Sequence, residues 1–152
     1  MSDPPRGLPS SALLRLAYNA LAARIYSAVV SGTAFEDLRP AHGNAMEQLE
    51  LEDGLRLTDM AMRAGMTAQS MGELVDDLER KGYLERRPDP NDRRAKRIYL
   101  TARGRENARI AKQATTDVEA QLATLLGARR YQTLRRALEE IIAAGGGGEG
   151  QR

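Results

Sequence analysis

The sequence predicts a mainly helical fold that contains one small β-hairpin. All six prolines lie at positions 4, 5, 9, 40, 88 and 90. Long proline-free spans therefore remain for helices, in which an interior proline would cost about 3 kcal/mol. Apolar residues recur every three or four positions over most of the chain, which is the spacing of one helix face. Only residues 84–100 show the alternation that is typical of strands.

The N-terminal part of the chain predicts two helices. The first covers residues 11–30, where apolar positions follow the helical period, and Gly32 ends it. Pro40 fits the first turn of a second helix, which continues to Gly54. Residues 1–10, which precede these helices and hold three prolines, are expected to be flexible.

Residues 58–82 predict two further helices joined by a tight turn. The first is short, with Thr58 as its N-cap and Gly65 at its end. The next starts at Thr67 and ends at Gly82. The positions that this second helix presents to the core are Met71, Leu74, Val75 and Leu78.

A β-hairpin with a basic tip follows. Residues 84–87 and 96–100 predict its two strands, and the run Pro88-Asp89-Pro90-Asn91-Asp92 predicts the turn between them. Helical periodicity returns at Thr101, breaks at Gly127 and resumes up to residue 144. The Gly-rich residues 145–152 predict a flexible tail.

The terminal helices, residues 11–31 and 102–144, have narrow apolar stripes that are rich in alanine. Such stripes suit close helix packing, and we expect them to form an interface with a second subunit. The alternative is that they pack within one chain. Residues 11–144 are predicted to form a single domain.

The composition excludes several functional classes. The chain has no cysteine and one histidine, which excludes disulfides, thiol chemistry and multi-histidine metal sites. We find no nucleophile–base pair and no Gly-rich phosphate loop, so we expect neither an enzyme nor a cofactor. No apolar run is long enough for a membrane helix, and no signal peptide is recognisable, so a cytoplasmic location is predicted.

Charge is unevenly distributed along the chain, although the net charge is only +2. Residues 44–79 carry nine acidic and two basic side chains, whereas residues 80–112 carry twelve basic ones. A local positive patch attracts phosphate whatever the total charge, although such a run can also be a solvated surface. Most of these basic residues are arginines, whose planar guanidinium suits phosphates and base edges.

A short helix, a glycine turn, a second helix and a hairpin with an Arg-rich tip describe a winged helix–turn–helix. The residues resemble the MarR (multiple antibiotic resistance regulator) family. The matching stretch is Leu57-Thr58-Asp59-Met60-Ala61 through Gly65-Met66-Thr67, then residues 74–94, closing with Leu100-Thr101. Its most specific part is Asp92-x-Arg94 followed by Leu100-Thr101.

The resemblance implies a homodimer in which the terminal helices intertwine around a winged unit of residues 40–100, with the wing at 84–100. It also implies that Arg94 reaches a minor groove of DNA while Asp92 holds its guanidinium. A narrow A·T-rich groove attracts such an arginine. An Asp–Arg pair on a turn can also be only a local structural pair.

The expected recognition helix is unusual because it is acidic and holds no Arg or Lys between Arg63 and Arg80. Gln69 can pair with adenine, and Glu73 can accept a hydrogen bond from cytosine. Ser70 can reach a base or a phosphate, or bond to backbone N–H groups in the first turn. The residues expected to contact DNA are Thr67, Ala68, Gln69, Ser70, Gly72, Glu73, Arg86, Arg87, Asp92, Arg93, Arg94, Lys96 and Arg97.

The function predicted from these observations is that of a dimeric, sequence-specific DNA-binding repressor that a small-molecule effector releases. Tyr18, Tyr26 and His42 are candidates for the effector pocket, although His42 is more simply a buried histidine bonded to backbone. The alternative function is a winged-helix module that binds proteins. Such a module has no need for an Arg-rich wing, and salt-dependent DNA binding would separate the two functions.

Overall fold

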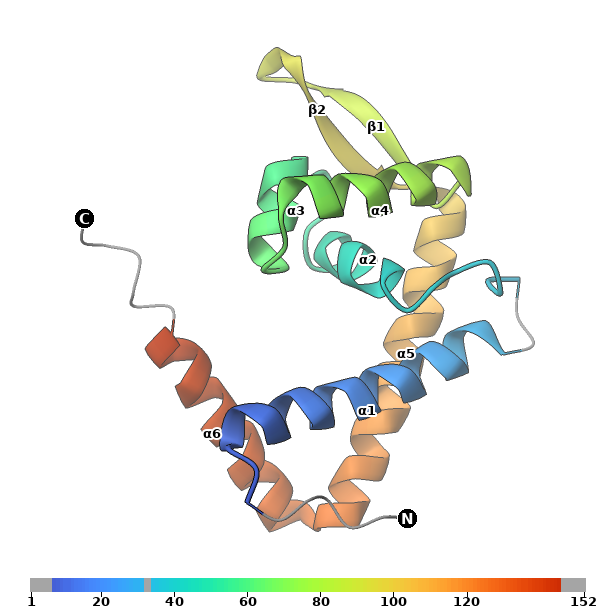
Figure 1. The fold of residues 1–152 in the computed structure, drawn as a ribbon. Coiled ribbons are helices and arrows are strands. Elements are labelled where there is room, and N and C mark those ends of the chain that lie inside the picture. The colour runs from blue at the N-terminus through green and yellow to red at the C-terminus, as the bar shows by residue number, and fades with distance from the viewer. Residues whose placement is uncertain (1–6, 32–33, 146–152) are drawn as a thin grey trace. The chain divides into compact units, whose positions relative to one another are not determined.

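The computed structural model describes residues 7–31 and 34–145, and its elements follow the predicted order (Figure 1). The elements of this part are α1 (Ser10–Val30), α2 (His42–Leu51), α3 (Leu57–Arg63), α4 (Ala68–Arg80), β1 (Leu84–Asp89), β2 (Asp92–Leu100), α5 (Ala102–Leu126) and α6 (Ala128–Gly145). The predicted mainly helical fold with a hairpin wing is confirmed. Most of both predicted flexible ends, and Gly32 as a helix end, lie outside the described residues. None of the helices described is both long and apolar enough to span a membrane.

The chain divides into two compact units, the first ending at Ala114 and the second beginning at Thr115. The first unit contains α1 to α4, the hairpin and the start of α5. In the second unit, the Tyr131 hydroxyl donates a hydrogen bond to Glu119, and Arg135 lies 3.5 Å from the same carboxylate. The single-domain limits of residues 11–144 stay a prediction.

The core of the first unit is built on one face of α4. All four positions predicted to face inward are buried, and Val75 and Leu78 are fully inaccessible. They pack with α2, α3 and the base of the hairpin, as Figure 1 shows. The largest core partners from these elements are Met46, Leu49, Met60, Leu84 and Ile98. Burial of this face fixes the position of α4 against the two preceding helices.

The predicted start of the second helix is wrong. Pro40 lies in a turn before α2, and the helix begins at His42. The imidazole Nδ1 of His42 accepts the backbone N–H of Arg39 at 2.9 Å. This bond stabilises the turn in front of the helix, so Pro40 precedes the first turn instead of forming it.

Thr58 is also not the N-cap of the third helix. α3 begins at Leu57, and the carbonyl of Arg56 accepts the N–H of Met60 at 3.1 Å. Arg56 is the N-cap, so the helix starts two residues earlier than predicted and Thr58 lies inside it. By contrast, α4 begins at Ala68, next to the predicted start, and Thr67 is its N-cap, whose hydroxyl oxygen accepts the N–H of Ser70 at 3.1 Å.

The hairpin is longer than predicted. Its antiparallel strands pair from Leu84 opposite Leu100 to Asp89 opposite Asp92, which leaves two residues for the turn instead of five. Pro88 belongs to β1 because a strand of a two-stranded sheet has a free edge, where the missing N–H of proline is tolerated. Of the five residues predicted as the turn, Pro88, Asp89 and Asp92 are therefore paired in the strands, with an irregularity between Pro88 and Asp89.

Gly104, in the first turn of α5, lies against the backbone of Tyr83. A Cβ atom at this position would lie 2.2 Å from the Tyr83 carbonyl oxygen. The Tyr83 carbonyl also accepts the N–H of Thr101 at 3.0 Å, so it cannot move away without breaking this bond. The close approach of α5 to the end of α4 thus requires glycine.

We expect Gly104→Ala to lower the free energy of unfolding by about 1–3 kcal/mol, because the added methyl overpacks against backbone. Urea denaturation of the two proteins measures this difference. Gly43→Ala is the matched control, since Gly43 is helical and its Cβ would meet nothing within 4 Å. The control should be neutral or slightly stabilising. Equal stability of Gly104→Ala and the parent chain would contradict this packing.

Candidate nucleic-acid interface

The N-terminal half of α4 presents a small polar face. Thr67, Ala68, Gln69, Ser70 and Glu73 are exposed, and Gly72 is half-buried. The Thr67 hydroxyl donates to the Ser70 hydroxyl oxygen at 2.9 Å while accepting the Ser70 N–H. Gln69 and Glu73 are four residues apart, so they lie on the same side of the helix. This face has the residue types that read base edges by hydrogen bonding.

The acidic character of α4 has a structural explanation. Arg86, on β1, donates from Nη2 to Asp76 at 2.6 Å and from Nη1 to Glu79, and its backbone N–H donates to Glu79. These carboxylates thus join the recognition helix to the hairpin. Arg86 was predicted to contact DNA, but its guanidinium is already paired with two carboxylates of the same chain.

A buried carboxylate anchors the hairpin at its other end. The Asp89 side chain is fully inaccessible, and its Oδ2 accepts hydrogen bonds from Arg56 at 2.9 Å and Arg97 at 3.0 Å. Its Oδ1 accepts the backbone N–H of Asn91 at 2.9 Å. The Asn91 N–H, followed by the two arginines, lowers the pKa of Asp89 to about 2 despite its burial. Asp89 therefore ties the wing to the residue that precedes α3.

Sequence reasoning did not identify Asp89 or Arg56 as part of this site. An aspartate between two prolines is typical of a turn, and nothing in its neighbourhood along the chain indicates burial. The only available signal was indirect: Arg56 is one of two cations in an otherwise acidic stretch, residues 44–79.

Arg97 has a structural role in addition to any contact with DNA. Besides its bond to Asp89, its Nη1 donates to the carbonyl of Gly54 at 3.1 Å. The neighbouring Ile98 forms a bridge with Leu55, so β2 is connected to the segment between α2 and α3. Arg97 therefore helps to hold β2 in place, and its contact with DNA stays a prediction.

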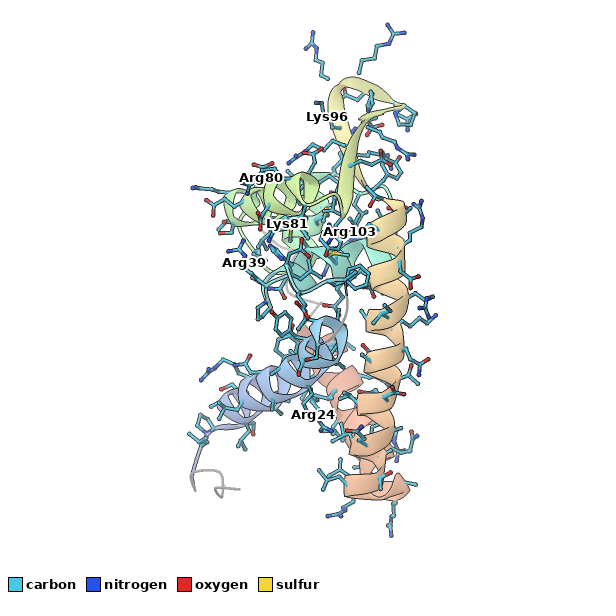
Figure 2. All side chains as sticks on the ribbon, turned by 90° about the vertical axis from the view of Figure 1, so that its right-hand side faces the viewer. Arg24, Arg39, Arg80, Lys81, Lys96 and Arg103 are labelled. Carbon is cyan, nitrogen blue, oxygen red and sulfur yellow. The ribbon has the colours of Figure 1, made fainter. Side chains whose placement is uncertain are left out.

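The tip of the hairpin carries the cations that remain accessible. Arg93, Arg94 and Lys96 are exposed, and among the described residues no carboxylate pairs with them. Figure 2 shows Lys96 on the hairpin, apart from Arg80 and Lys81 at the end of α4. The tip is thus the part of the wing whose positive charge is free to meet a phosphate.

The expected pairing of Asp92 with the Arg94 guanidinium is not found. Asp92 Oδ1 accepts the backbone N–H of Arg94 at 3.0 Å, and Oδ2 lies 3.9 Å from Arg56. A short acidic side chain at a turn bonds more readily to the backbone two residues on than to a long side chain. Asp92 therefore orders the backbone of the tip, and the Arg94 guanidinium has no carboxylate partner within the described ranges.

Arg87 projects from β1, where it pairs with Glu85 and lies over the ring of Tyr99, 4.8 Å from its centroid. It is exposed, so its contacts restrict the side chain without removing it from solvent. Arg87 can therefore still approach a phosphate.

The three candidate effector residues occupy different surroundings. Tyr18 is 57% exposed on α1, whereas the Tyr26 hydroxyl donates to the carbonyl of Leu38 at 3.0 Å. His42 is buried, and both ring nitrogens are engaged, Nδ1 by the Arg39 N–H and Nε2 by Asp77 at 2.9 Å. Burial lowers the pKa of His42 below 6.5, with nearby Lys81 acting in the same direction. No group of three or more acidic or histidine side chains that could hold a metal ion occurs within the described ranges.

Comparisons with known proteins agree with this geometry. The model of the MarR family matches residues 36–95. The HTH-type transcriptional repressor Rv2887 of Mycobacterium tuberculosis (strain ATCC 25618 / H37Rv) is 28% identical over 96 residues, which are 63% of this chain and 69% of that protein.

Two solved structures extend the likeness over most of the chain. The transcriptional repressor CouR, bound to a 23-mer DNA duplex, is 27% identical with a TM-score of 0.67, covering 93% of this chain and 99% of that one. The PcaV regulator of Streptomyces coelicolor, in complex with its natural ligand, is 21% identical with a TM-score of 0.69, covering 95% and 99%.

The helix–turn–helix of α3 and α4, followed by a basic hairpin, defines a winged-helix protein. The stretch from just before α2 to the hairpin tip matches the model of the MarR family, and the chain is similar to that family. The family resemblance found in residues 57–101 is thereby confirmed.

The buried Asp89 predicts a distinct acid response. A carboxyl with a lowered pKa stabilises the fold fully above its unfolded value of 3.8, and this contribution is lost as pH falls through about 2. We expect Asp89→Asn to be less stable than the parent chain at pH 7, because two arginines lose their acceptor. The difference in stability between the parent chain and Asp89→Asn should become smaller between pH 4 and pH 2. Thermal unfolding across this range measures it.

Glu73→Gln, which neutralises an exposed carboxylate, is the matched control, and its stability should equal that of the parent chain across this pH range. A stability difference for Asp89→Asn that stays constant down to pH 2 would show that the carboxylate form is not what stabilises the wing.

Proposed function

We propose that this protein is a homodimeric transcriptional repressor that binds double-stranded DNA. In each subunit, α4 would lie in a major groove while the hairpin tip reaches the flanking minor groove. The observation that carries the proposal is the combination of an exposed polar face on α4 with a hairpin tip whose three cations have no carboxylate partner among the described residues. The DNA duplex bound by the related repressor CouR supports it.

The roles of the proposed contact residues differ. Gln69, Ser70 and Glu73 would read base edges, while Thr67, Ala68 and Gly72 would allow α4 to approach the groove closely. At the tip, Arg94 would enter the minor groove, and Arg93 and Lys96 would bind phosphates. Arg86, Arg87, Asp92 and Arg97 would mainly hold the hairpin in place, with Arg87 also accessible to phosphate.

The proposal also includes a small-molecule effector. The related PcaV regulator was crystallised with its natural ligand, so we propose that a small molecule releases this repressor from DNA. The pocket of Tyr18, Tyr26 and His42 stays a prediction, as do the cytoplasmic location and the absence of enzymatic activity.

The dimer is supported by the surface of α1. Leu13, Leu14, Leu16 and Tyr18 are each between 38% and 57% exposed on this one helix. An apolar helix surface of this kind is usually buried in an interface, and we propose that a second copy of the chain buries it.

Sedimentation at low micromolar concentration should give twice the chain mass of 16.7 kDa. Leu14→Arg should shift the population toward monomers, because a charge would be buried in the interface. Leu51→Arg is the control: Leu51 is 76% exposed on α2, and its replacement should leave the dimer intact. A parent chain that sediments as a folded monomer would contradict the proposal.

The DNA-binding test starts by selecting a preferred duplex from a random pool, followed by titration at two salt concentrations. Arg93→Ala and Lys96→Ala should weaken binding to all sequences alike and lower the salt slope by about 1 per lost phosphate contact. Arg94→Ala should cost about 1–3 kcal/mol per half-site and relax the preference at flanking A·T positions.

Arg109→Ala is the matched control, because it also removes one exposed positive charge, but from α5, where Arg109 pairs with Glu106. It should leave the affinity almost unchanged. The alternative function, a protein-binding winged helix, would be favoured if no duplex were selected and binding to DNA showed no steep salt dependence.

A further inference from the structure

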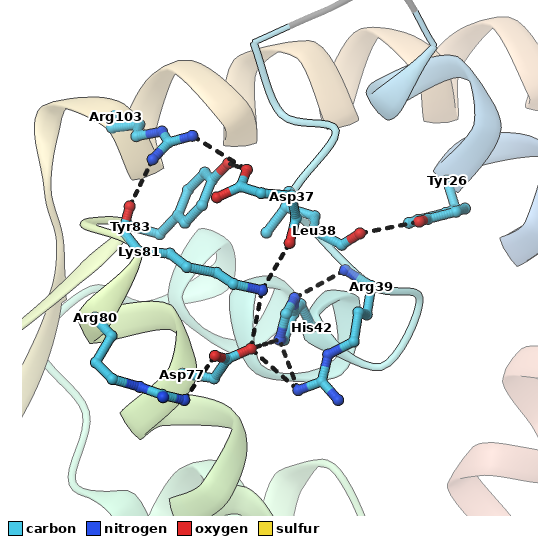
Figure 3. A network of polar contacts seen from close by, with 10 residues as sticks. All are labelled: Tyr26, Asp37, Leu38, Arg39, His42, Asp77, Arg80, Lys81, Tyr83 and Arg103. Atoms are coloured by element: carbon cyan, nitrogen blue, oxygen red, sulfur yellow. Dashed lines mark hydrogen bonds and ion pairs between the residues drawn. The ribbon is translucent and has the colours of Figure 1, made fainter.

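The C-terminal part of α4 contains a charged junction centred on Asp77. Its carboxylate is bonded by Arg80 at 2.7 Å and Lys81 at 3.0 Å from the end of the same helix. It is also bonded by Arg39 at 3.1 Å and by His42 Nε2 at 2.9 Å, from the segment that enters α2 (Figure 3). Four donors from two parts of the fold therefore converge on one carboxylate. The pKa of Asp77 is lowered to about 2, with the Lys81 bond as the largest cause.

Further bonds join the same two parts. Lys81 Nζ donates to the carbonyl of Asp37 at 2.7 Å, and the Tyr83 hydroxyl donates to the Asp37 carboxylate at 2.6 Å. Arg103, from α5, also donates to this carboxylate at 3.1 Å. Residues 34–42, which we call the α1–α2 connector, are thus bonded to the end of α4.

The α1–α2 connector is bonded in turn to α1. The Tyr26 hydroxyl donates to the carbonyl of Leu38, the residue between Asp37 and Arg39 (Figure 3). A continuous series of polar contacts therefore runs from α1 through the connector to the recognition helix. The apolar core is a separate connection between these parts, because Phe35 and Leu38 of the connector are buried in it together with the apolar face of α4.

Loss of the Asp77 carboxylate would leave like charges together. Arg39, Arg80 and Lys81 would repel one another, and the buried imidazole of His42 would lose the acceptor of its Nε2–H. Because Arg39 and His42 come from the segment that enters α2, whereas Arg80 and Lys81 come from α4, this repulsion favours separation of the end of α4 from the connector. With 13 residues, α4 is about 20 Å long, so a tilt of about 5° about this end moves its other end by roughly 1.7 Å. Hydrogen bonds to base edges do not survive such a displacement.

We propose that Asp77 is a positioning residue for sequence-specific DNA binding. It fixes the C-terminal end of α4 to the α1–α2 connector and so sets the angle at which Gln69, Ser70 and Glu73 face a groove. This inference rests on the DNA-binding function proposed above. Asp77 does not itself contact DNA.

The test compares Asp77→Asn with Glu106→Gln. Both variants remove one negative charge, but Glu106 is exposed on α5, where it pairs with Arg109 of the same helix. Affinities for the selected duplex and for an unrelated duplex are measured at two salt concentrations. We expect Asp77→Asn to lose about tenfold in affinity for the selected duplex and to keep its affinity for the unrelated one. Glu106→Gln should bind both duplexes as tightly as the parent chain.

A second variant, Arg39→Ala, keeps the proposal testable if Asp77→Asn does not fold. The Arg39 side chain is 61% exposed, so its removal leaves the core intact while breaking one of the two bonds from the connector. It should lose about threefold in selective affinity, and its effect should not add to that of Asp77→Asn.

The proposal is overturned if Asp77→Asn binds the selected duplex as tightly as the parent chain or more tightly, since Asp77 would then have no positioning role. It is also overturned if affinity for both duplexes falls in parallel with the thermal midpoint, or if Arg39→Ala keeps full selectivity. Failure of the proposed function itself is distinguishable, because the parent chain would then select no duplex at all.

Discussion

Burial of the apolar face of α4 is the constraint on which the rest of the winged unit depends. Leu78 and Val75 are completely enclosed, and the residues around them come from α2, α3 and both strands of the hairpin. Because one face of α4 forms this core, the opposite face is fixed in solvent with its polar residues outward. The position of the recognition helix and the composition of its exposed face are therefore two results of the same packing.

Carboxylates then fix the positions of the hairpin and of the α1–α2 connector relative to the core. Asp76 and Glu79 bond to Arg86 on β1, Asp89 holds the opposite end of the hairpin, and Asp77 holds the α1–α2 connector. The acidic composition of α4, which is unexpected in a helix proposed to approach DNA, is thus largely explained by ion pairs within the chain. Most of these pairs lie near the surface, where an ion pair adds little stability but restricts geometry.

The fold was largely predictable, because helical periodicity and glycine positions depend on local sequence. The four buried positions of α4 and its N-cap Thr67 follow directly from spacing and residue type. The burial of Asp89 could not be predicted, because it depends on Arg56, 33 residues away in sequence, as well as on Arg97 of the facing strand. The sequence also predicts phosphate contacts for Arg86 and Arg97. It does not reveal that carboxylates of the same chain pair with both arginines in the folded structure.

The distribution of paired and unpaired cations determines which residues would attract DNA of any sequence and which would distinguish one sequence from another. With a net charge of only +2, long-range attraction is weak, and salt screens it beyond about 10 Å. Because Arg86 and Arg97 are already paired with carboxylates, the tip residues Arg93 and Arg94 would supply much of the phosphate affinity. The reading face of α4 adds no positive charge, and Glu73 repels phosphates and base acceptors alike. Such a face binds weakly to most sequences, so a small number of well-placed hydrogen bonds can produce a large preference for one of them.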